Sequence, residues 1–140
     1  MGNGACLRIG HRGAAALAPR NTLRSFQKAL DLGVDALELD VRLTADSQLV
    51  VIHDEDVAHS TSGQGFVHDY TLADLRHLDA GQGERIPTFG DALDFLRGKA
   101  LIVVDLKLTG YEEQGVQAIV DHGVQDDVMV CSLFPASLRR

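Results

Sequence analysis

Two carboxylates, two positions apart, are followed thirteen residues later by a histidine and a further aspartate. Glu38 and Asp40 flank Leu39, and His53 and Asp54 come later. In an extended strand, side chains two positions apart share a face, so both carboxylates point the same way. Adjacent carboxylates repel each other and are costly to bury unpaired, and a divalent cation is the simplest partner that makes them favourable. The pair therefore predicts a metal site.

A turn lies between these two motifs. Residues 44–47, Thr-Ala-Asp-Ser, separate the apolar-rich stretches 34–43 and 49–52. If the chain folds back at this turn, His53 returns close to Glu38. A metal site and a potential proton carrier then share one small volume.

A second polar group follows the first apolar run, residues 6–10. His11 suits proton transfer near neutral pH, and Arg12 suits bidentate phosphate binding. Gly13 would let the backbone approach a ligand closely. An ordinary junction between a strand and a loop can have the same composition, so the triplet indicates a functional site only if other functional groups lie beside it.

A third polar group follows the continuous apolar run at 101–104. Asp105 and Lys107 share one face of an extended chain, which indicates either a local ion pair or part of a site. Taken with Glu38 and Asp40, this group gives three carboxylates from two strands. Such hard oxygen ligands suit Mg²⁺ or Ca²⁺, with water and substrate oxygens completing the shell.

The elements that must position these residues alternate along the chain. Apolar runs predict strands at 6–10, 34–43, 49–52, 101–104 and 128–131. Amphipathic spacing predicts helices at about 22–32, with Asn21 as its N-cap, and at 72–78, 89–97 and 110–122. This alternation is typical of a parallel sheet with crossover helices, and ligand chemistry in such folds lies after the carboxyl ends of the strands.

Composition narrows the classes of function. The 140 residues carry a formal net charge of −7, which argues against nucleic acid as the main partner, although a bound metal can still attract a phosphate substrate. No apolar run approaches the ~20 residues of a membrane span. Residues 1–6 lack the features of a secretion signal. Cys6 and Cys131 stand beside apolar runs and are expected to be buried thiols in a reducing compartment, the cytoplasm.

Short motifs occur along the chain in a particular order. They are His-Arg-Gly (11–13), Asn-Thr-Leu (21–23), Gly-Val-Asp (33–35), Glu-Leu-Asp-Val (38–41), Thr-Ala-Asp (44–46), Val-Ile-His-Asp (51–54), Ser-Thr-Ser-Gly-Gln-Gly (60–65), Leu-Asp-Ala-Gly (78–81), Ile-Pro-Thr-Phe (86–89), Asp-Leu-Lys (105–107) and Cys-Ser-Leu (131–133). In order and spacing, this set resembles the glycerophosphodiester phosphodiesterase family, from about residue 8 to the last residues.

The resemblance implies a (β/α)8 TIM barrel of the phospholipase-C-like kind. It also implies metal-dependent hydrolysis of glycerophosphodiesters to glycerol 3-phosphate and an alcohol. The family's catalytic acid/base pair matches His11 and His53, its phosphate-contacting arginine matches Arg12, and its substrate-contacting lysine matches Lys107. The family's metal-binding carboxylates match Glu38, Asp40 and Asp105.

The sequence departs from the family pattern at three positions. Arg20 stands where a glutamate usually precedes Asn-Thr, Asp105 replaces a glutamate ligand, and His59 replaces an arginine. We expect Arg20 to change the local charge near His11 and Arg12. The shorter Asp105 would require the metal to shift or a water to bridge.

The chain has room for only part of such a barrel. Four barrel strands are expected at about 6–10, 35–41, 101–106 and 128–132, with residues 48–54 as the return arm of a hairpin. A complete barrel normally needs ~250 residues. We therefore interpret residues 1–140 as a single partial domain, the N-terminal half. Its first and fourth strands would have open edges, which favour self-association.

Two other functions stay open from the sequence. A half-barrel can bind metal or phosphate without turnover, or pair with a partner, and a related phosphodiesterase would cleave lysophospholipids instead. The sequence assigns neither the acid nor the base among the two catalytic histidines. The remaining histidines are predicted to be structural or at the surface: His59, His68, His77 and His122.

Overall fold

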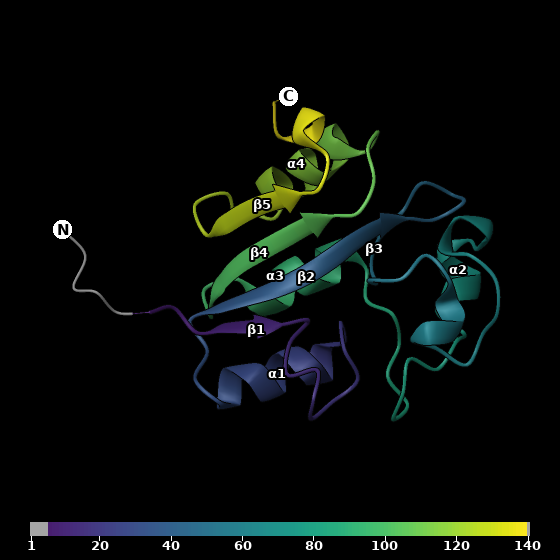
Figure 1. The fold of residues 1–140 in the computed structure, drawn as a ribbon, viewed down its shortest axis with the longest axis horizontal. Coiled ribbons are helices and arrows are strands. Elements are labelled where there is room, and N and C mark those ends of the chain that lie inside the picture. The colour runs from purple at the N-terminus through teal and green to yellow at the C-terminus, as the bar shows by residue number, and fades with distance from the viewer. Residues whose placement is uncertain (1–5, 140) are drawn as a thin grey trace.

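A computed structural model describes residues 6–139 of the chain. A sheet lies at the centre, with helices packed behind it (Figure 1). The expectation about a secretion signal rests on residues that, apart from Cys6, lie outside the described part. Among the described residues, no helix has the length and apolar character needed to cross a bilayer.

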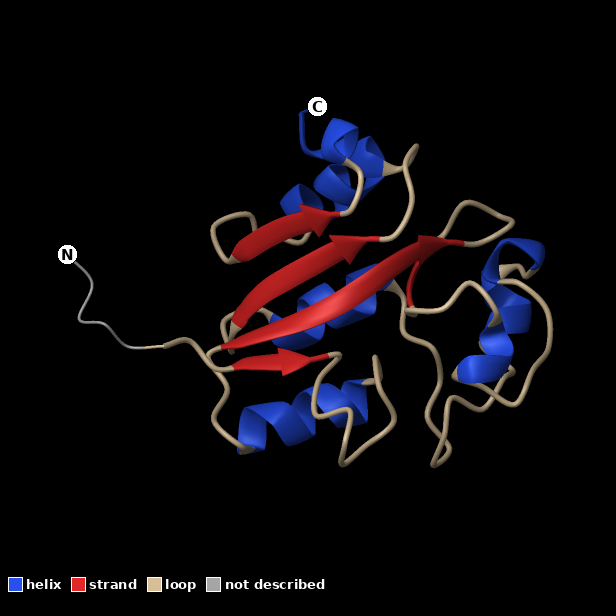
Figure 2. Cartoon of the chain, viewed as in Figure 1, coloured by secondary structure: helices blue, strands red, loops and turns tan. Residues whose placement is uncertain are grey.

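Four parallel strands make up the main sheet in the order β1-β2-β4-β5 (Figure 2). They are β1 (Ile9–His11), β2 (Ala36–Leu43), β4 (Leu101–Leu106) and β5 (Val128–Ser132). The fifth strand, β3 (Leu49–Val51), runs antiparallel beside the end of β2. Each parallel connection passes through a helix, as crossovers between parallel strands require.

Three helices cover one face of the sheet: α1 (Leu23–Asp31), α3 (Phe89–Leu96) and α4 (Glu112–Asp121). Thr88 and Asp91 form a reciprocal cap at the start of α3. Such caps satisfy amide groups that have no partner inside the helix, and they fix where the helix begins.

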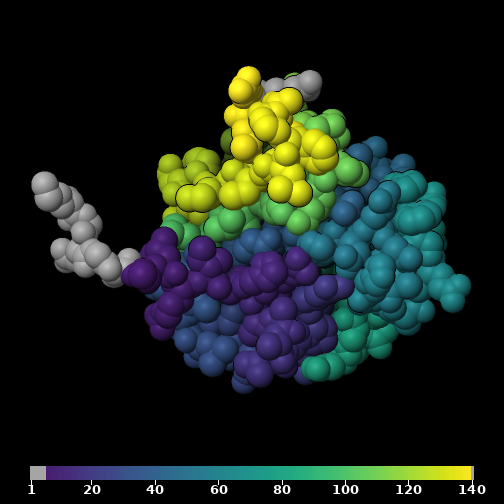
Figure 3. All heavy atoms as spheres, viewed as in Figure 1, coloured from purple at the N-terminus to yellow at the C-terminus, as the bar shows by residue number. Residues whose placement is uncertain are grey.

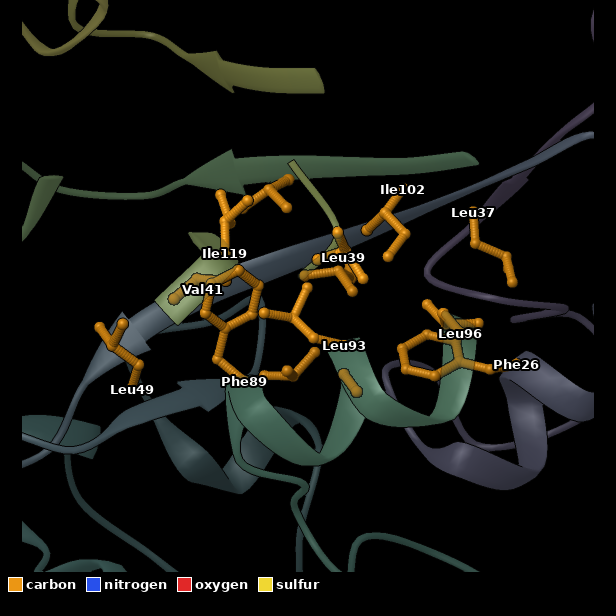
Figure 4. Packing of buried hydrophobic residues seen from close by; sticks show 14 of the residues in the cluster. Phe26, Leu37, Leu39, Val41, Leu49, Phe89, Leu93, Leu96, Ile102 and Ile119 are labelled. Atoms are coloured by element: carbon orange, nitrogen blue, oxygen red, sulfur yellow. The ribbon is translucent and has the colours of Figure 1, made fainter. Parts of the chain in front are cut away.

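The side chains that point from the sheet toward these helices are apolar and buried. From β2 and β4 they are Leu37, Leu39, Val41, Ile102, Val104 and Leu106. Phe89, Leu93 and Leu96 of α3 pack against this layer (Figure 4). Burying one such side chain stabilises the fold by about 1.5–3 kcal/mol, so this layer holds the strands in place.

A smaller core lies under the excursion between β3 and α3. This excursion contains the short helix α2 (Leu72–Leu75) and the 3₁₀ turns η1 (Val57–His59) and η2 (Val67–Asp69). The buried residues of this smaller core are Val50, Ile52, Val57, Val67, Leu75, Ala80 and Ile86. The excursion is therefore packed onto the hairpin rather than hanging free of it.

The opposite face of the sheet carries no helix of the described chain, and it faces the viewer in Figure 1. Ile9, Leu101 and Met129 on the strands are 53%, 43% and 63% exposed. The space-filling view shows N-terminal atoms in purple and C-terminal atoms in yellow along opposite sides of this face (Figure 3). The 3₁₀ turn η3 (Pro135–Arg139) ends the described chain beside β5.

The structure corrects several expectations about these elements. Thr22, not Asn21, caps α1, because its side chain accepts a hydrogen bond from Ser25 N. The strand expected at 6–10 is β1, which pairs only from Ile9 to His11, so Cys6 precedes the sheet and is exposed rather than buried. Helix α2 ends at Leu75 instead of residue 78.

Two further sequence expectations need correction. The segment 60–70, expected as a loop, contains the turn η2. Cys131 lies in β5 and is half-buried, because β5 is an edge strand. Both Cys6 and Cys131 are free thiols.

Candidate active site

Three carboxylates meet at the carboxyl ends of the two central strands, on the open face. Glu38 and Asp40 come from β2, and Asp105 lies directly opposite Asp40 on β4. One oxygen from each of the three lies within 4.8 Å of the others. The parallel register places these oxygens together, since adjacent strands carry them at the same height. This group could hold a divalent cation.

Asp40 is the buried centre of the site. Its Oδ2 accepts a hydrogen bond from Asn21 Nδ2 at 2.8 Å and lies 3.2 Å from Arg12 Nε. Its Oδ1 lies 2.7 Å from Lys107 Nζ, without the alignment of a full hydrogen bond. Burial alone would raise the pKa of Asp40, but the contacts with Lys107 and Asn21 hold that pKa below its ordinary value.

Lys107 lies between two of the three carboxylates. Its ammonium group contacts Asp40 and also donates to Asp105 Oδ2. Burial opposes the charged ammonium, yet the contacts with Asp105 and Asp40 outweigh it and raise the pKa of Lys107 above its ordinary value. The lysine is therefore a built-in counter-charge for the acidic cluster.

Glu38 has a different electrostatic setting. Burial first, and then the charge of Asp40, raise the pKa of Glu38 from 4.5 to about 7. The backbone amide of Arg12 donates to Glu38 Oε2 at 3.0 Å and partly offsets this. A nearby cation would favour the charged form of Glu38.

His11 ends β1 directly beside Glu38. Its Nε2 lies 3.8 Å from Glu38 Oε2, and its side chain is 69% exposed. The register of β1 against β2 causes this placement, because His11 and Glu38 are partners across the ladder. The imidazole thus projects from the open face at the edge of the acidic cluster.

His53 returns to the cluster on the hairpin arm. Strand β3 pairs with β2 so that Val51 faces Val41, and the Ile52 amide donates to the Asp40 carbonyl at 3.0 Å. The expected fold-back of residues 49–52 is confirmed. Arg42 Nε donates to the His53 carbonyl at 2.8 Å, which anchors the histidine backbone.

The loop after β1 supplies contacts that the sequence alone did not reveal. Arg12 and Asn21 both have positive φ, 55° and 58°, and the Asn21 amide donates to the Arg12 carbonyl at 3.0 Å. Gly13 also has a positive φ of 80°, and a Cβ there would lie 2.4 Å from Ser25 Oγ. This tight backbone aims Asn21 at Asp40 instead of at the helix.

Arg20 lies in a different place from the one expected. Its side chain pairs with Asp54 at 2.5 Å, and none of its described contacts is with His11 or Arg12. The replacement of the family's glutamate by Arg20 therefore changes the charge beside His53, the second histidine of the site. Asp54 was noticed in the sequence only as the neighbour of His53, and no local pattern links it to position 20.

A sequence profile of the Glycerophosphoryl diester phosphodiesterase family matches residues 11–136. This chain belongs to that family. A glycerophosphodiester phosphodiesterase of Caldanaerobacter subterraneus is 40% identical over 144 aligned residues, covering 94% of this chain and 59% of the relative. A glycerophosphodiester phosphodiesterase of Bacillus subtilis is 33% identical and aligns over 83% of this chain and 46% of its own length. The chain thus spans about half the length of these relatives.

Solved structures of family members share this fold. The glycerophosphodiester phosphodiesterase of Agrobacterium tumefaciens superposes with a TM-score of 0.87 at 33% identity, over 92% of this chain and 58% of its own. A phosphodiesterase of Oleispira antarctica, solved with the product sn-glycerol-3-phosphate, gives 0.86 at 33% identity, over 93% and 58%. The expected fold class is confirmed: the four parallel strands and the hairpin form part of the family's (β/α)8 barrel.

Proposed function

We propose that this chain carries the metal and acid/base site of a phosphodiesterase that hydrolyses glycerophosphodiesters to glycerol 3-phosphate and an alcohol. The observation that carries this proposal is the convergence of Glu38, Asp40 and Asp105, with His11 3.8 Å from Glu38 and His53 near enough to act electrostatically on Asp40. Family membership and the product-bound relative support it. We further propose a cytoplasmic location, where the two free thiols stay reduced.

The acidic cluster fits a hard divalent cation, which we propose to be Mg²⁺ or Ca²⁺. All three donors are carboxylates, and the raised pKa of Glu38 reflects first its burial and then repulsion by Asp40, both of which a nearby cation would offset. When bound, such an ion offsets negative charge on the phosphate oxygens. Glu38, Asp40 and Asp105 are the residues that would hold it.

The two histidines are suited to move protons on either side of the phosphate. One imidazole would accept a proton from the attacking hydroxyl, and the other would give a proton to the leaving alkoxide. His11 comes from β1 and His53 from the hairpin, so the two approach the acidic cluster from different elements. In-line displacement at phosphorus requires that the acid and the base act from opposite sides of the phosphate.

Arg12 and Lys107 would contact the substrate phosphate. Both cations lie within 3.2 Å of Asp40 oxygens, and their side chains are only 17% and 14% exposed. A partly desolvated guanidinium can bind two phosphate oxygens at once, while an ammonium acts as a point charge. Together they would stabilise the charge that grows on the phosphate as the ester bond breaks.

Turnover of glycerophosphocholine with and without Mg²⁺ or Ca²⁺ tests this proposal. We expect metal-dependent release of glycerol 3-phosphate, and a loss of about 100- to 10,000-fold in His11→Ala and in His53→Ala. His68→Ala is the matched control, because that histidine is 59% exposed and its ion-pair partners are Glu55 and Asp69. Undiminished metal-dependent turnover in His11→Ala would overturn the mechanism.

A second candidate is a half-barrel that binds metal or phosphate and pairs with another copy. The open face supports it, since Ile9 and Met129 on the edge strands and Leu101 on a central strand are exposed apolar side chains. Exposed apolar surface beside open strand edges favours association.

Analytical ultracentrifugation with titration calorimetry separates the two candidates. Self-association through the open face predicts a concentration-dependent dimer that Met129→Lys weakens. Val120→Lys is the control, because Val120 is 52% exposed but lies on the helical side, and this substitution should leave the dimer unchanged. Binding of Mg²⁺ or glycerol 3-phosphate without product release would favour the second candidate. A monomer at all concentrations would exclude pairing between copies.

A further inference from the structure

Asp54 joins a cation to the imidazole of His53. Its Oδ1 lies 2.8 Å from His53 Nδ1, and its Oδ2 lies 2.5 Å from Arg20 Nη2. The three side chains are 23–32% exposed, so they are partly shielded from water. One carboxylate therefore bridges the guanidinium and the ring, one oxygen to each.

Arg20 is itself fixed by the segment that follows the hairpin. Besides Asp54, its Nη2 donates to the His59 carbonyl at 3.2 Å and to Ser60 Oγ at 3.1 Å. Three acceptors around one nitrogen hold the guanidinium in place. Its neighbour Asn21 meanwhile reaches Asp40, so consecutive residues of one loop support both the acidic cluster and the histidine.

We propose that Arg20 is a positioning residue for His53 and acts through Asp54. The effect of Arg20 on catalysis rests on the proposed function, whereas its effect on the His53 ring does not. Arg20 keeps Asp54 ionised and aligned, and the carboxylate then holds the proton of the neutral imidazole on Nδ1. Nε2 is left with its lone pair, and it is the nitrogen with which His53 would take or give a proton.

The electrostatics of Asp54 agree with this arrangement. Partial burial alone would raise the pKa of Asp54, but the hydrogen bond with His53 and the charge of Arg20 hold that pKa below its ordinary value. A carboxylate that stays charged is a strong acceptor for an imidazole N–H.

His11 differs from His53 in its surroundings. It is 69% exposed, and its ion-pair contact is the 3.8 Å approach to Glu38. His53, at 29% exposed, is held through its carbonyl by Arg42 and through its ring by Asp54. Among residues 6–139, such supporting groups contact His53 but not His11.

The contact between positions 20 and 59 brings two departures from the family pattern close together in space. Arg20 replaces a glutamate and His59 replaces an arginine. Because Arg20 touches the His59 carbonyl, both positions border Asp54. In this chain the cation beside Asp54 comes from position 20.

Long-range ¹H–¹⁵N NMR spectra of the histidine rings test the proposal without any need for turnover. In the ¹⁵N-labelled chain, we expect neutral His53 to carry its proton on Nδ1, with the resonances assigned from His53→Ala. Arg20→Met and Asp54→Asn should both raise the fraction with the proton on Nε2. Arg20→Lys should keep most of the original tautomer. Arg24→Met is the matched control, since Arg24 forms an exposed ion pair with Glu84 at 3.2 Å.

Kinetics provide the second readout. We expect Arg20→Met to lower kcat by about 10- to 100-fold, part of what acid/base catalysis contributes, with little change in KM. Arg20→Lys should restore most of kcat, which a merely structural role would not predict. If Arg20→Met does not fold, Arg20→Gln replaces it.

The outcomes distinguish the positioning role of Arg20 from the proposed function. An unchanged His53 tautomer in a folded Arg20→Met chain overturns the positioning role, whatever the activity. A wild-type chain with the expected tautomer and no turnover under any metal leaves the positioning role standing and overturns the proposed function.

Discussion

The two faces of one sheet have opposite compositions, although they are built from the same strands. On the helix-covered face, Leu37, Leu39 and Val41 are fully buried. On the open face, the intervening residues Glu38 and Asp40 join a network of charges. A single strand thus alternates between groups that hold the fold and groups that could carry the chemistry.

This contrast indicates that the stability of the fold and the chemistry of the site depend on different groups. The covered face gains its free energy from apolar burial, which is insensitive to pH and to ions. The open face holds several charged groups close together, and their mutual contacts outweigh the cost of burial at Asp40 and Lys107 but not at Glu38. Substitutions on the two faces should therefore respond to different experimental variables.

The largest effect is expected on the covered face. Leu39→Ala should lower the free energy of unfolding by about 2–5 kcal/mol, because Leu39 is 0% exposed and its loss leaves a cavity under α3. Urea denaturation followed by circular dichroism measures this change.

Met129→Ala on the open face is the matched control for Leu39→Ala. Met129 is 63% exposed, so we expect its truncation to change the free energy of unfolding by less than about 0.5 kcal/mol in the monomer. Equal losses at both positions would erase the distinction between the two faces.

The second-largest effect is expected in the pH dependence of the free energy of unfolding, through Glu38. The pKa of Glu38 is raised to about 7 in the fold from 4.5, so the folded state binds the proton more tightly than the unfolded state. Its stabilising contribution is full below about pH 4.5 and is lost as pH rises through about 7. Without divalent ions, we expect unfolding free energy to fall by about 1–3 kcal/mol across this window.

Glu38→Gln should flatten that part of the pH profile, as denaturation midpoints at several pH values will show. Leu39→Ala, one residue away on the other face, should lower the whole profile without changing its slope there. A Glu38→Gln profile as steep as that of the wild type would contradict the assigned pKa.

The smallest expected effect concerns Lys107 and metal affinity. The ammonium of Lys107 occupies the space between Asp40 and Asp105 that a cation would share. Lys107→Met should therefore tighten Mg²⁺ or Ca²⁺ binding by about tenfold, a little over 1 kcal/mol, in titration calorimetry. Lys99→Met is the control, because Lys99 lies over the Phe95 ring. Weaker binding in Lys107→Met would show that the lysine organises the carboxylates instead of competing.

Much of the scaffold could be predicted from sequence because its signals are local. The alternation around Glu38 and Asp40 correctly predicted opposite faces of β2, and the turn at 44–47 predicted the return of the hairpin. The boundaries were less accurate at β1, where pairing stops at the residues that find a partner on β2.

The contacts among loop residues could not be predicted in the same way. Asn21 and Thr22 are both good cap residues, and only the positive φ of Asn21 directs its side chain to Asp40. The pairing of Arg20 with Asp54 joins segments 34 residues apart, and no periodicity encodes it. Such contacts depend on the folded backbone.

The hairpin that returns His53 to Asp40 has a consequence for how the site assembles. Only thirteen residues separate these two side chains along the chain, so their approach requires the closure of a short loop, which takes place on a microsecond timescale in isolated hairpins. Asp105 comes from a distant part of the sequence, and the chain reaches it through the crossover that contains α3. One part of the site is thus local in the chain and the other non-local, and non-local contacts are the kind that slow the folding of a domain.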